Sequence, residues 1–418
     1  MGYLQKIKSS PFIKNSAVLM AGTILSQAIP IGLAPVLARI FDKSEFALYY
    51  LYFSGVTMFF TLFTLRYEQA VVLPETKREA NHLIVLASLI SIAMGLFFSV
   101  SCFFLKDQIA LWVNNTGFAK WVFMVPIAMT FIGVYQAFNY FLTREKNFVG
   151  SSINRITQRV VEGIVNITTG LLHIPGGQLL GDFSGRIGVA VMSSSQSARL
   201  GFTLKDFDFQ LMKSLAKRYY QFAVYGSFPA FLNSVSSNIP VLFVSNFYNE
   251  NVVADFGYSR MILAMPLSII SVNISQVLLQ RIVEKKNKGE NVYRELKKIF
   301  LMLLAFSFLI FLVLQFFAPS IFAFVLGAKW ETAGAYSSIL ATGFAIRFAV
   351  SPLSCVFTAY ERVKSLSAWQ MGYFFAILSL LLFPNLSIES FLWTYTIIDV
   401  VSYTIYLWLI RRAVLKAR

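Results

Sequence analysis

Long hydrophobic stretches separated by short polar segments run along the whole chain. The two clearest, residues 83–105 and 299–318, contain no charged residue. A membrane-spanning helix needs about 20 mostly apolar residues. Reading the remaining stretches in the same way predicts twelve such helices, near residues 15–38, 46–73, 83–105, 121–143, 153–174, 177–196, 221–247, 252–279, 299–318, 335–360, 365–384 and 390–410.

Basic side chains are distributed unevenly over the segments between these helices. If the N-terminus lies inside, the cytoplasmic segments hold 26 Lys and Arg residues, the opposite side holds five, and the spans hold the other five. Cytoplasmic loops of membrane proteins carry an excess of Lys and Arg. The distribution therefore predicts that both termini lie in the cytoplasm, which requires an even number of spans.

Composition places the chain outside the soluble classes. Of its 418 residues, 57% are apolar and only 13% are charged, whereas soluble domains carry about 25% charged residues. In a soluble protein the net charge of +16 would suggest a nucleic-acid partner. Here the basic loops face the cytoplasmic leaflet, so anionic membrane lipids are the nearer partner and we expect no nucleic acid to bind.

The polar segments leave no room for a soluble catalytic domain. The longest, residues 197–220 and 280–298, have only about twenty residues each. The sequence contains no Walker loop, HExxH motif, CxxC pair or nucleophile elbow, which are the motifs that mark nucleotide, metal and serine chemistry. We therefore expect no enzyme, no cofactor and no metal site, and we expect His82 to be exposed in a cytoplasmic loop.

The two halves of the chain share short matching runs. Pro-Val-Leu occurs at residues 35–37 and again at 240–242, in the first predicted span of each half. This correspondence indicates a duplication. We therefore predict two pseudo-symmetric lobes of six helices, at residues 1–198 and 221–418, joined by a basic cytoplasmic linker at 199–220. Six spans per half make the repeats parallel, and we expect a central cleft between the lobes.

The first span of each half also contains prolines, Pro30 and Pro35 in one and Pro229 and Pro240 in the other. Proline removes a backbone donor from a helix, and lipid-exposed backbone does not tolerate an unpaired group. We therefore expect both spans to be interrupted. Broken helices at corresponding positions of two halves are typical of the central pathway of a transporter.

Arginines inside the spans point to an anionic substrate. Each costs about 2.5–3.5 kcal/mol at a helix centre, so we expect them to face protein or water. Guanidinium forks match the oxygens of phosphate and carboxylate. The predicted substrate-binding residues of a cationic cleft are Arg155, Arg159, Arg186, Arg260 and Arg347, together with Asn233 on the seventh span.

Four acids accompany these arginines and are candidate ion-coupling groups, namely Glu162, Asp182, Asp255 and Asp399. Arg260 and Arg347 have no acid one helical turn away, which favours a water-filled cavity around them. A cleft with surplus arginine favours an anion, whereas an exporter of lipophilic cations would need surplus carboxylates.

Structural interpretations of the same residues stay open. Arg159 and Glu162 are spaced i,i+3, and Asp182 and Arg186 are spaced i,i+4. Such pairs on one helix can simply neutralise each other. For Asp399, a buried hydrogen bond to another helix is favoured over a coupling role.

Several runs of the sequence resemble bacterial polysaccharide flippases of the Wzx type. In the first half they are APVLAR at residues 34–39, before a Phe-Asp turn, and LRYEQAVVLP at 65–74. The runs in the second half are PLS at 266–268 with Gln276, LGAKW at 326–330 followed by Ala333 and Gly334, and SPLS at 351–354. The similarity covers nearly the whole chain.

The resemblance implies an all-α integral membrane fold of about twelve transmembrane helices in two lobes, shared with multidrug-and-toxin exporters. It also implies a substrate, an oligosaccharide repeat unit on an undecaprenyl diphosphate carrier. The flippase would move this unit from the cytoplasmic to the periplasmic leaflet of the bacterial inner membrane. There the unit would be used in the biosynthesis of O-antigen and lipopolysaccharide. Glycan polymerase and chain-length regulator proteins would be partners.

Two other functions stay open. One is a cation-coupled multidrug exporter of the same fold. The other is a glycan polymerase or ligase within the membrane, which would ordinarily need a larger external loop than this sequence provides.

Overall fold

The computed structural model describes residues 11–205, 207–287, 290, 292–360 and 362–415. Over these residues all regular secondary structure is helical. Seven helical segments are long and apolar enough to cross a membrane by length and composition alone, and the more polar α6 and α7 are not among them. The chain divides into two compact units, Met1–Leu242 (unit 1) and Phe243–Arg418 (unit 2).

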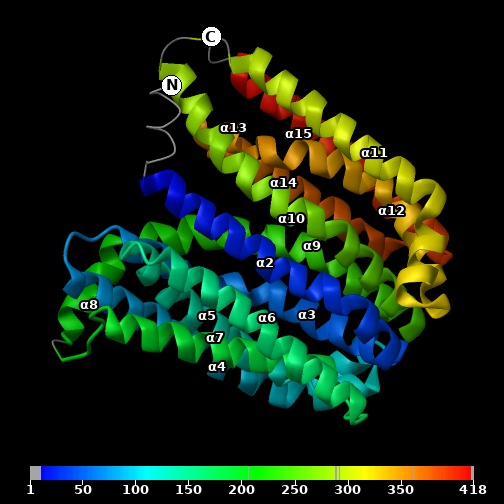
Figure 1. Cartoon of the computed structure of the whole chain (residues 1–418), viewed down its shortest axis with the longest axis horizontal. Helices are drawn as coiled ribbons and strands as arrows, with labels where there is room; N and C mark the ends of the chain where they lie inside the picture. The colour runs from blue at the N-terminus through cyan, green and yellow to red at the C-terminus, as the bar shows by residue number, and fades with distance from the viewer. Residues whose placement is uncertain (1–10, 206, 288–289, 291, 361, 416–418) are drawn as a thin grey trace. The chain divides into compact units, whose positions relative to one another are not determined.

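Unit 1 consists of the first helices of the chain. They are α2 (Pro11–Ile40), α3 (Lys43–Phe63), η1 (Tyr67–Val72), α4 (Lys77–Trp112), η2 (Thr116–Lys120), α5 (Met124–Arg144), α6 (Phe148–Leu171), α7 (Gly177–Arg199), α8 (Phe209–Arg218), η3 (Phe222–Gly226) and most of α9 (Ser227–Phe247). Within this unit α6 packs against α2 and α7, and α5 packs against α4 and α7 (Figure 1).

Unit 2 contains the end of α9 and the later helices. They are α10 (Glu250–Asn287), α11 (Val292–Leu326), η4 (Ala328–Trp330), α12 (Glu331–Val350), η5 (Ser351–Ser354), α13 (Cys355–Ala359), α14 (Val363–Leu378), η6 (Ser379–Leu382) and α15 (Ile388–Leu415). Here α12 packs against α10, α11 and α15. Each of the twelve predicted spans contains one long helix, although the span at 335–360 also takes in η5 and α13 and the span at 365–384 takes in η6.

The second predicted span was too long. Helix α3 ends at Phe63, ten residues before the hydrophobic pattern at 46–73 does. Leu65 and Arg66 have positive φ angles of 46° and 59°, a left-handed conformation that stops a right-handed helix. The apolar residues that follow form the separate turn η1, so hydrophobicity continues where the helix does not.

The prediction that prolines interrupt the first span of each half was wrong for Pro30, Pro35 and Pro240. Helix α2 continues through Pro30 and Pro35, and α9 continues through Pro240. Proline has a helical φ angle, so a helix resumes after losing one hydrogen bond. Only Pro229 is preceded by an irregularity, the π-helical turn η3. A wider turn relieves the clash of a proline ring with the carbonyl four residues earlier.

The polar segment at 280–298 is largely helical, contrary to its interpretation as a loop. Helices α10 and α11 both extend into it. Ion pairs join them, because Glu295 contacts Arg281 at 2.6 Å and Lys285 at 2.7 Å. The linker predicted at 199–220 likewise contains the helix α8, whose N-terminal amides bond the side chain of Asp208.

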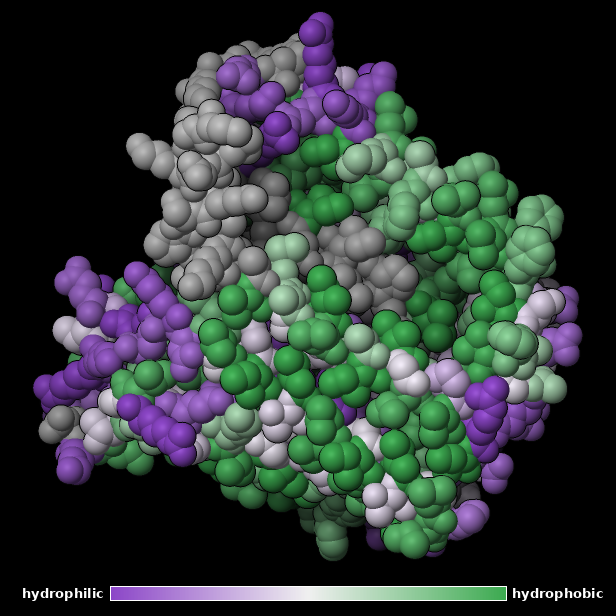
Figure 2. Space-filling view, in the orientation of Figure 1, coloured by the Kyte–Doolittle hydropathy of each residue, from purple (hydrophilic) through white to green (hydrophobic). Residues whose placement is uncertain are grey.

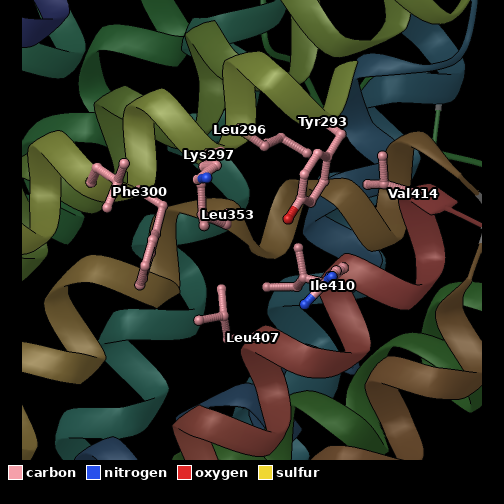
Figure 3. A pocket seen from close by; sticks show the side chains of 10 residues that line it. Tyr293, Leu296, Lys297, Phe300, Leu353, Leu407, Ile410 and Val414 are labelled. Atoms are coloured by element: carbon pink, nitrogen blue, oxygen red, sulfur yellow. The ribbon is translucent and has the colours of Figure 1, made fainter. Parts of the chain in front are cut away.

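Apolar side chains cover the outside of the helices. Figure 2 shows hydrophobic residues along their length and hydrophilic residues gathered at their ends. Phe97 and Phe104 on α4 and Phe308 and Phe316 on α11 are all more than half exposed. An apolar surface of this extent is typical of helices that contact lipid. Near one end of unit 2, side chains of α11 and α15 and Leu353 of η5 surround a cavity of about 220 Å³ (Figure 3).

Candidate functional site

Two ion pairs of unit 1 lie on neighbouring helices. On α6, the Arg159 guanidinium contacts the Glu162 carboxylate at 2.6 Å. On α7, Arg186 Nε donates a hydrogen bond to Asp182 Oδ2. Glu162, Asp182 and Arg186 are buried. Both pairings that the spacing on one helix permits are therefore formed.

A close approach of α6 and α7 joins the two pairs. A Cβ atom on Gly181 would lie 2.9 Å from the carbonyl oxygen of Glu162, and one on Gly185 would lie 2.7 Å from that of Gln158. Only glycine permits this separation of the helices. Glu162 and Asp182 come within electrostatic range of each other. We call Arg159, Glu162, Asp182 and Arg186 the unit 1 charge network.

Two tyrosines of α3 complete this network. Tyr52 is fully buried and its hydroxyl donates to Asp182 Oδ2 at 2.8 Å, while Tyr49 lies within electrostatic range of all four charged residues. Asp182 Oδ1 and Asn166 Oδ1 are buried and have no hydrogen-bond partner among the described residues. Buried oxygens in this condition are places where a proton, a cation or water is accommodated.

Arg155 is the third charged residue of α6, beside the pair Arg159 and Glu162. It begins the polar stripe of α6 that also carries Arg159 and Glu162. Its Nη1 donates to Thr23 Oγ1 of α2 at 2.6 Å, and it bonds the hydroxyl of Tyr135 on α5. Within the described part of the chain no carboxylate pairs with it. The network itself is balanced, so the excess positive charge of α6 is at Arg155.

Unit 2 holds its buried acid differently. Asp399 on α15 is 1% exposed. Tyr373 on α14 donates its hydroxyl proton to Asp399 Oδ1 at 2.7 Å, which is a hydrogen bond between helices. Arg260 on α10 and Arg347 on α12 lie within electrostatic range of the same carboxylate. Four helices thus contribute to what we call the unit 2 cluster, made of Arg260, Arg347, Tyr373 and Asp399.

Aromatic rings lie against the two arginines of this cluster. The Arg347 guanidinium carbon is 5.6 Å from the ring centre of Tyr403. That of Arg260 is 5.5 Å from the ring centre of Phe256. Cation–π contacts stabilise a guanidinium that has left water. Both side chains are half-buried, and the rings lie beside them in addition to the carboxylate of Asp399.

The remaining two candidates lie on the helices at the junction of the units in the chain. Asp255 is buried on α10 and is within electrostatic range of Tyr336 on α12. Asn233 on α9 is exposed.

A further polar site, which the sequence reasoning missed, follows the end of α3. A cavity of about 210 Å³ is lined by polar and aromatic residues, among them Phe60, Thr61, Thr64, Arg66, Glu68, Gln136 and Tyr140. Glu68 is only 8% exposed, and its Oε2 has no hydrogen-bond partner among the described residues. Burial raises the pKa of this carboxyl, while a hydrogen bond from Thr64 and the charge of Arg66 oppose the shift.

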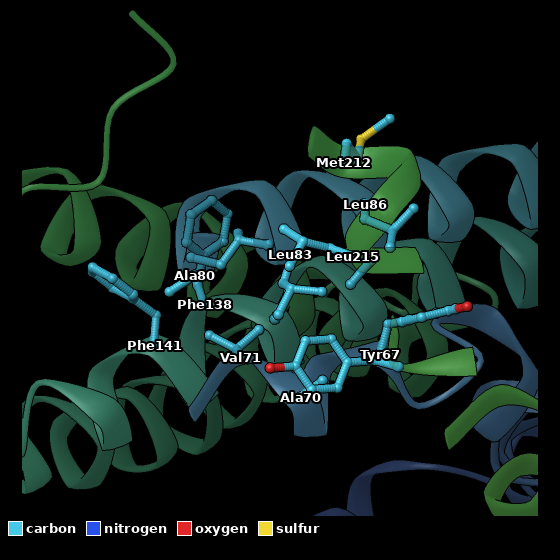
Figure 4. Packing of buried hydrophobic residues seen from close by; sticks show 14 residues of the cluster. Tyr67, Ala70, Val71, Ala80, Leu83, Leu86, Phe138, Phe141, Met212 and Leu215 are labelled. Carbon is cyan, nitrogen blue, oxygen red and sulfur yellow. The ribbon is translucent and has the colours of Figure 1, made fainter. Parts of the chain in front are cut away.

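Close packing holds Glu68 in this position. Its neighbours in η1, Tyr67, Ala70 and Val71, are buried against α4, α5 and α8 (Figure 4). The Tyr67 hydroxyl also donates to the carbonyl of Ala216 on α8 at 2.9 Å. The sequence did contain a signal for this site, because Glu68 is an acid within an otherwise apolar run. Arg66, two residues earlier, entered the sequence analysis only as one of the basic residues of a cytoplasmic loop.

His82 supports the same end of unit 1 and is not exposed as expected. It is 3% exposed, stacks on Phe207 and accepts a hydrogen bond from the Asp208 amide at 2.9 Å. Helix α4 begins six residues before the hydrophobic stretch does, so His82 lies inside a helix under the segment that leads to α8.

Comparison with protein families assigns the chain. The model of a family described as polysaccharide biosynthesis protein matches residues 36–335, well over half of the sequence. The chain belongs to this family. No curated protein matches the sequence closely enough to count as a relative.

Solved structures show which fold this family member has. An inward-facing multidrug resistance MATE family transporter of the MOP superfamily is similar over 97% of this chain and 98% of its own, with a TM-score of 0.68 and 16% identity. The lipid II flippase MurJ in an inward closed conformation is similar over 97% and 90%, with a TM-score of 0.69 and 16% identity. A MOP superfamily transporter from Pyrococcus furiosus matches over 97% and 95%, with a TM-score of 0.65 and 13% identity. The chain has the all-helical membrane fold of this superfamily.

Proposed function

We propose that the protein is a flippase for lipid-linked oligosaccharide, which it moves from the cytoplasmic to the periplasmic leaflet on an undecaprenyl diphosphate carrier. The observation that carries the proposal is a set of buried and half-buried arginines on the long helices of a member of a polysaccharide biosynthesis family. A glycan assembled on a lipid must cross the bilayer before it can be used outside. A membrane protein with a transporter fold suits that step.

The charged groups suggest how the substrate is held. Arg155, which carries the excess positive charge of α6, has hydroxyl partners rather than a carboxylate, so an arriving phosphate oxygen would replace a weaker acceptor. Arg260 and Arg347 lie against the rings of Phe256 and Tyr403 and within electrostatic range of Asp399, so they concentrate positive charge in unit 2. Guanidinium groups bind phosphate and carboxylate with two parallel hydrogen bonds.

The acids suggest roles in switching rather than in binding the anion. We propose that Asp182 and Asp399, with Glu162 and Asp255, respond to protons or cations during alternating access. Asp182 has a buried oxygen without a partner among the described residues. Transport does not require coupling to an ion. Moving two negative charges from the inner to the outer side of an inside-negative membrane releases about 4–5 kcal/mol at roughly 100 mV.

The decisive experiment uses the purified protein in liposomes that contain a lipid-linked oligosaccharide in both leaflets. An external glycosidase or lectin reports the fraction of glycan that it can reach. We expect about half to be reached without protein and nearly all with it. Failure to expose the second half, accompanied by efflux of a cationic dye, would contradict the proposal and favour the multidrug exporter.

Single substitutions then test the arginines. Arg260→Ala and Arg347→Ala should abolish glycan exposure while the protein still reaches the membrane in normal amount. The matched control is Arg199→Ala, since Arg199 is an exposed arginine at the end of α7, and it should retain flipping. Normal flipping by both variants would remove these arginines from the site.

A further inference from the structure

The cavity of about 220 Å³ in unit 2 has an unusual combination of linings. Most of its wall is apolar, with Phe300 and Leu301 from α11 and Leu407 and Ile410 from α15. Leu296, Phe300, Leu407 and Ile410 surround the space in Figure 3, and Lys297 and Tyr293 lie along the same edge of α11. The cavity therefore offers an apolar wall with a polar rim.

The rim is cationic. Lys297 on α11 and Arg411 on α15 both line the cavity, and no carboxylate of the described residues pairs with either. The guanidinium carbon of Arg411 lies 5.9 Å from the ring centre of Tyr293, and both residues line the cavity. The apolar part of the cavity thus ends at two cations that have no acidic counterpart in the described residues, and it is complementary to a ligand with a hydrophobic body and an anionic head.

The position along the helices agrees with this complementarity. Leu301 and Met302 are half or more exposed and belong to the lipid-facing surface of α11. Lys297 lies one turn before them, at the end that the distribution of basic residues assigns to the cytoplasm. This is the depth at which phospholipid headgroups lie, and the cytoplasmic leaflet is the one that carries anionic lipid.

We propose that this cavity is a binding site for an anionic glycerophospholipid of the cytoplasmic leaflet, of the phosphatidylglycerol type. The phosphate lies between Lys297 and Arg411, and one acyl chain begins along Phe300, Leu407 and Ile410. The volume is below the roughly 300–1,000 Å³ of a site that encloses a drug-sized ligand. It suits the head and first methylenes of a lipid whose tails continue in the bilayer. The site does not depend on which substrate the protein transports.

The test measures lipid binding to the full chain by native mass spectrometry, with phosphatidylglycerol and phosphatidylethanolamine of identical acyl chains. The parent protein should retain phosphatidylglycerol and release phosphatidylethanolamine. Each interfacial cation contributes about 1 kcal/mol, which is about fivefold in affinity. Lys297→Gln and Arg411→Gln should therefore each weaken binding about fivefold, and the double variant about 30-fold.

A matched control removes the same charge from the same region. Arg294 and Lys298 are exposed on α11 and do not line the cavity, so the variant Arg294→Gln/Lys298→Gln should bind phosphatidylglycerol as the parent does. Leu407→Phe keeps both cations and fills the cavity, and it should also weaken binding. Weaker binding by Leu407→Phe would show that the shape of the cavity matters, and not only the positive charge of the surface around it.

Three results would overturn the proposal. One is equal loss of phosphatidylglycerol from the double variant Lys297→Gln/Arg411→Gln and from the control Arg294→Gln/Lys298→Gln, which would indicate that surface charge alone attracts the lipid. Another is equal retention of both phospholipids by the parent. The third is displacement of phosphatidylglycerol by undecaprenyl phosphate at a tenfold lower concentration, which would assign the cavity to the carrier lipid.

Discussion

Unit 1 and unit 2 stabilise a buried carboxylate in different ways. Asp182 in unit 1 has an arginine on its own helix, Arg186, and receives a second hydrogen bond from Tyr52. Asp399 in unit 2 has Tyr373 from another helix, and the nearby guanidiniums also come from other helices. Asp182 thus has a charged partner four residues away on its own helix, whereas the partners of Asp399 all come from other helices.

Because of this difference, we expect the charges of unit 1 to stabilise the fold and the acid of unit 2 to change its protonation more readily. A tight ion pair is expensive to break, because the remaining charge stays buried without compensation. An acid held mainly by a tyrosine can lose or gain a proton with less disturbance of its neighbours. We therefore expect the unit 1 charge network to govern stability more than the unit 2 cluster does.

Replacement of the two acids tests this expectation most strongly. Asp182→Asn leaves the buried Arg186 without its carboxylate and should lower the free energy of unfolding by about 3–5 kcal/mol. Asp399→Asn keeps an oxygen that accepts from Tyr373 and should cost less, about 1–3 kcal/mol. Thermal unfolding of the purified proteins in one detergent compares them.

A double variant is the control for the first of these changes. Asp182→Asn/Arg186→Gln removes both charges together and should recover part of the loss, because no unpaired charge then stays buried. If the two single variants lose equal stability, the proposed distinction between the units is wrong.

Matched tyrosine substitutions give a smaller contrast. Tyr373→Phe removes the hydroxyl that donates to Asp399 and should cost about 1.5–3 kcal/mol, the range for hydrogen bonds to charged groups. Tyr52→Phe removes an equivalent bond, but Asp182 keeps Arg186, so about 1 kcal/mol is expected. The reverse order in chemical or thermal unfolding would show that Tyr52, rather than the arginine, holds its acid.

Arginine-to-lysine variants test the aromatic contacts. Arg347→Lys keeps the charge but loses the planar group that lies over Tyr403, and about 0.5–2 kcal/mol of stability should be lost. Arg155→Lys in unit 1 is the comparison, because Arg155 has hydroxyl partners from Thr23 and Tyr135. If Arg347→Lys leaves the unfolding temperature unchanged, the ring contact contributes nothing.

The smallest expected effect concerns Glu68, which lies between α3 and α4 and whose pKa is raised by burial. A raised pKa means that the folded protein binds more protons than the unfolded chain between the ordinary carboxyl pKa and the raised one. Stability should therefore fall as pH rises through that window. Glu68→Gln should remove this slope, measured as unfolding temperature against pH.

Glu75→Gln provides a matched change for comparison, because Glu75 is an exposed acid of the same segment. A slope that persists unchanged in Glu68→Gln would assign the pH dependence to other groups.

The sequence predicted the helical elements well, and their ends less well. Twelve hydrophobic stretches correspond to twelve long helices because the membrane requires about 20 apolar residues in each span. The end of α3 was missed, since the left-handed Leu65 and Arg66 lie within a run that stays apolar. Helix α8 was missed because its buried side chains, Met212 and Leu215, form too short a pattern to stand out in a basic segment.

Of the candidate site, the sequence alone determined the charged residues of the long helices and the pairs that form within one helix. Helical geometry brings i,i+3 and i,i+4 side chains together, so the partners of Arg159 and Arg186 could be found from spacing. The tertiary structure decided the rest, including the hydroxyl partners of Arg155, the rings beside Arg260 and Arg347 and the burial of Glu68. These contacts join residues far apart in the chain, and a periodic pattern records which face of a helix is polar but not which helix it meets.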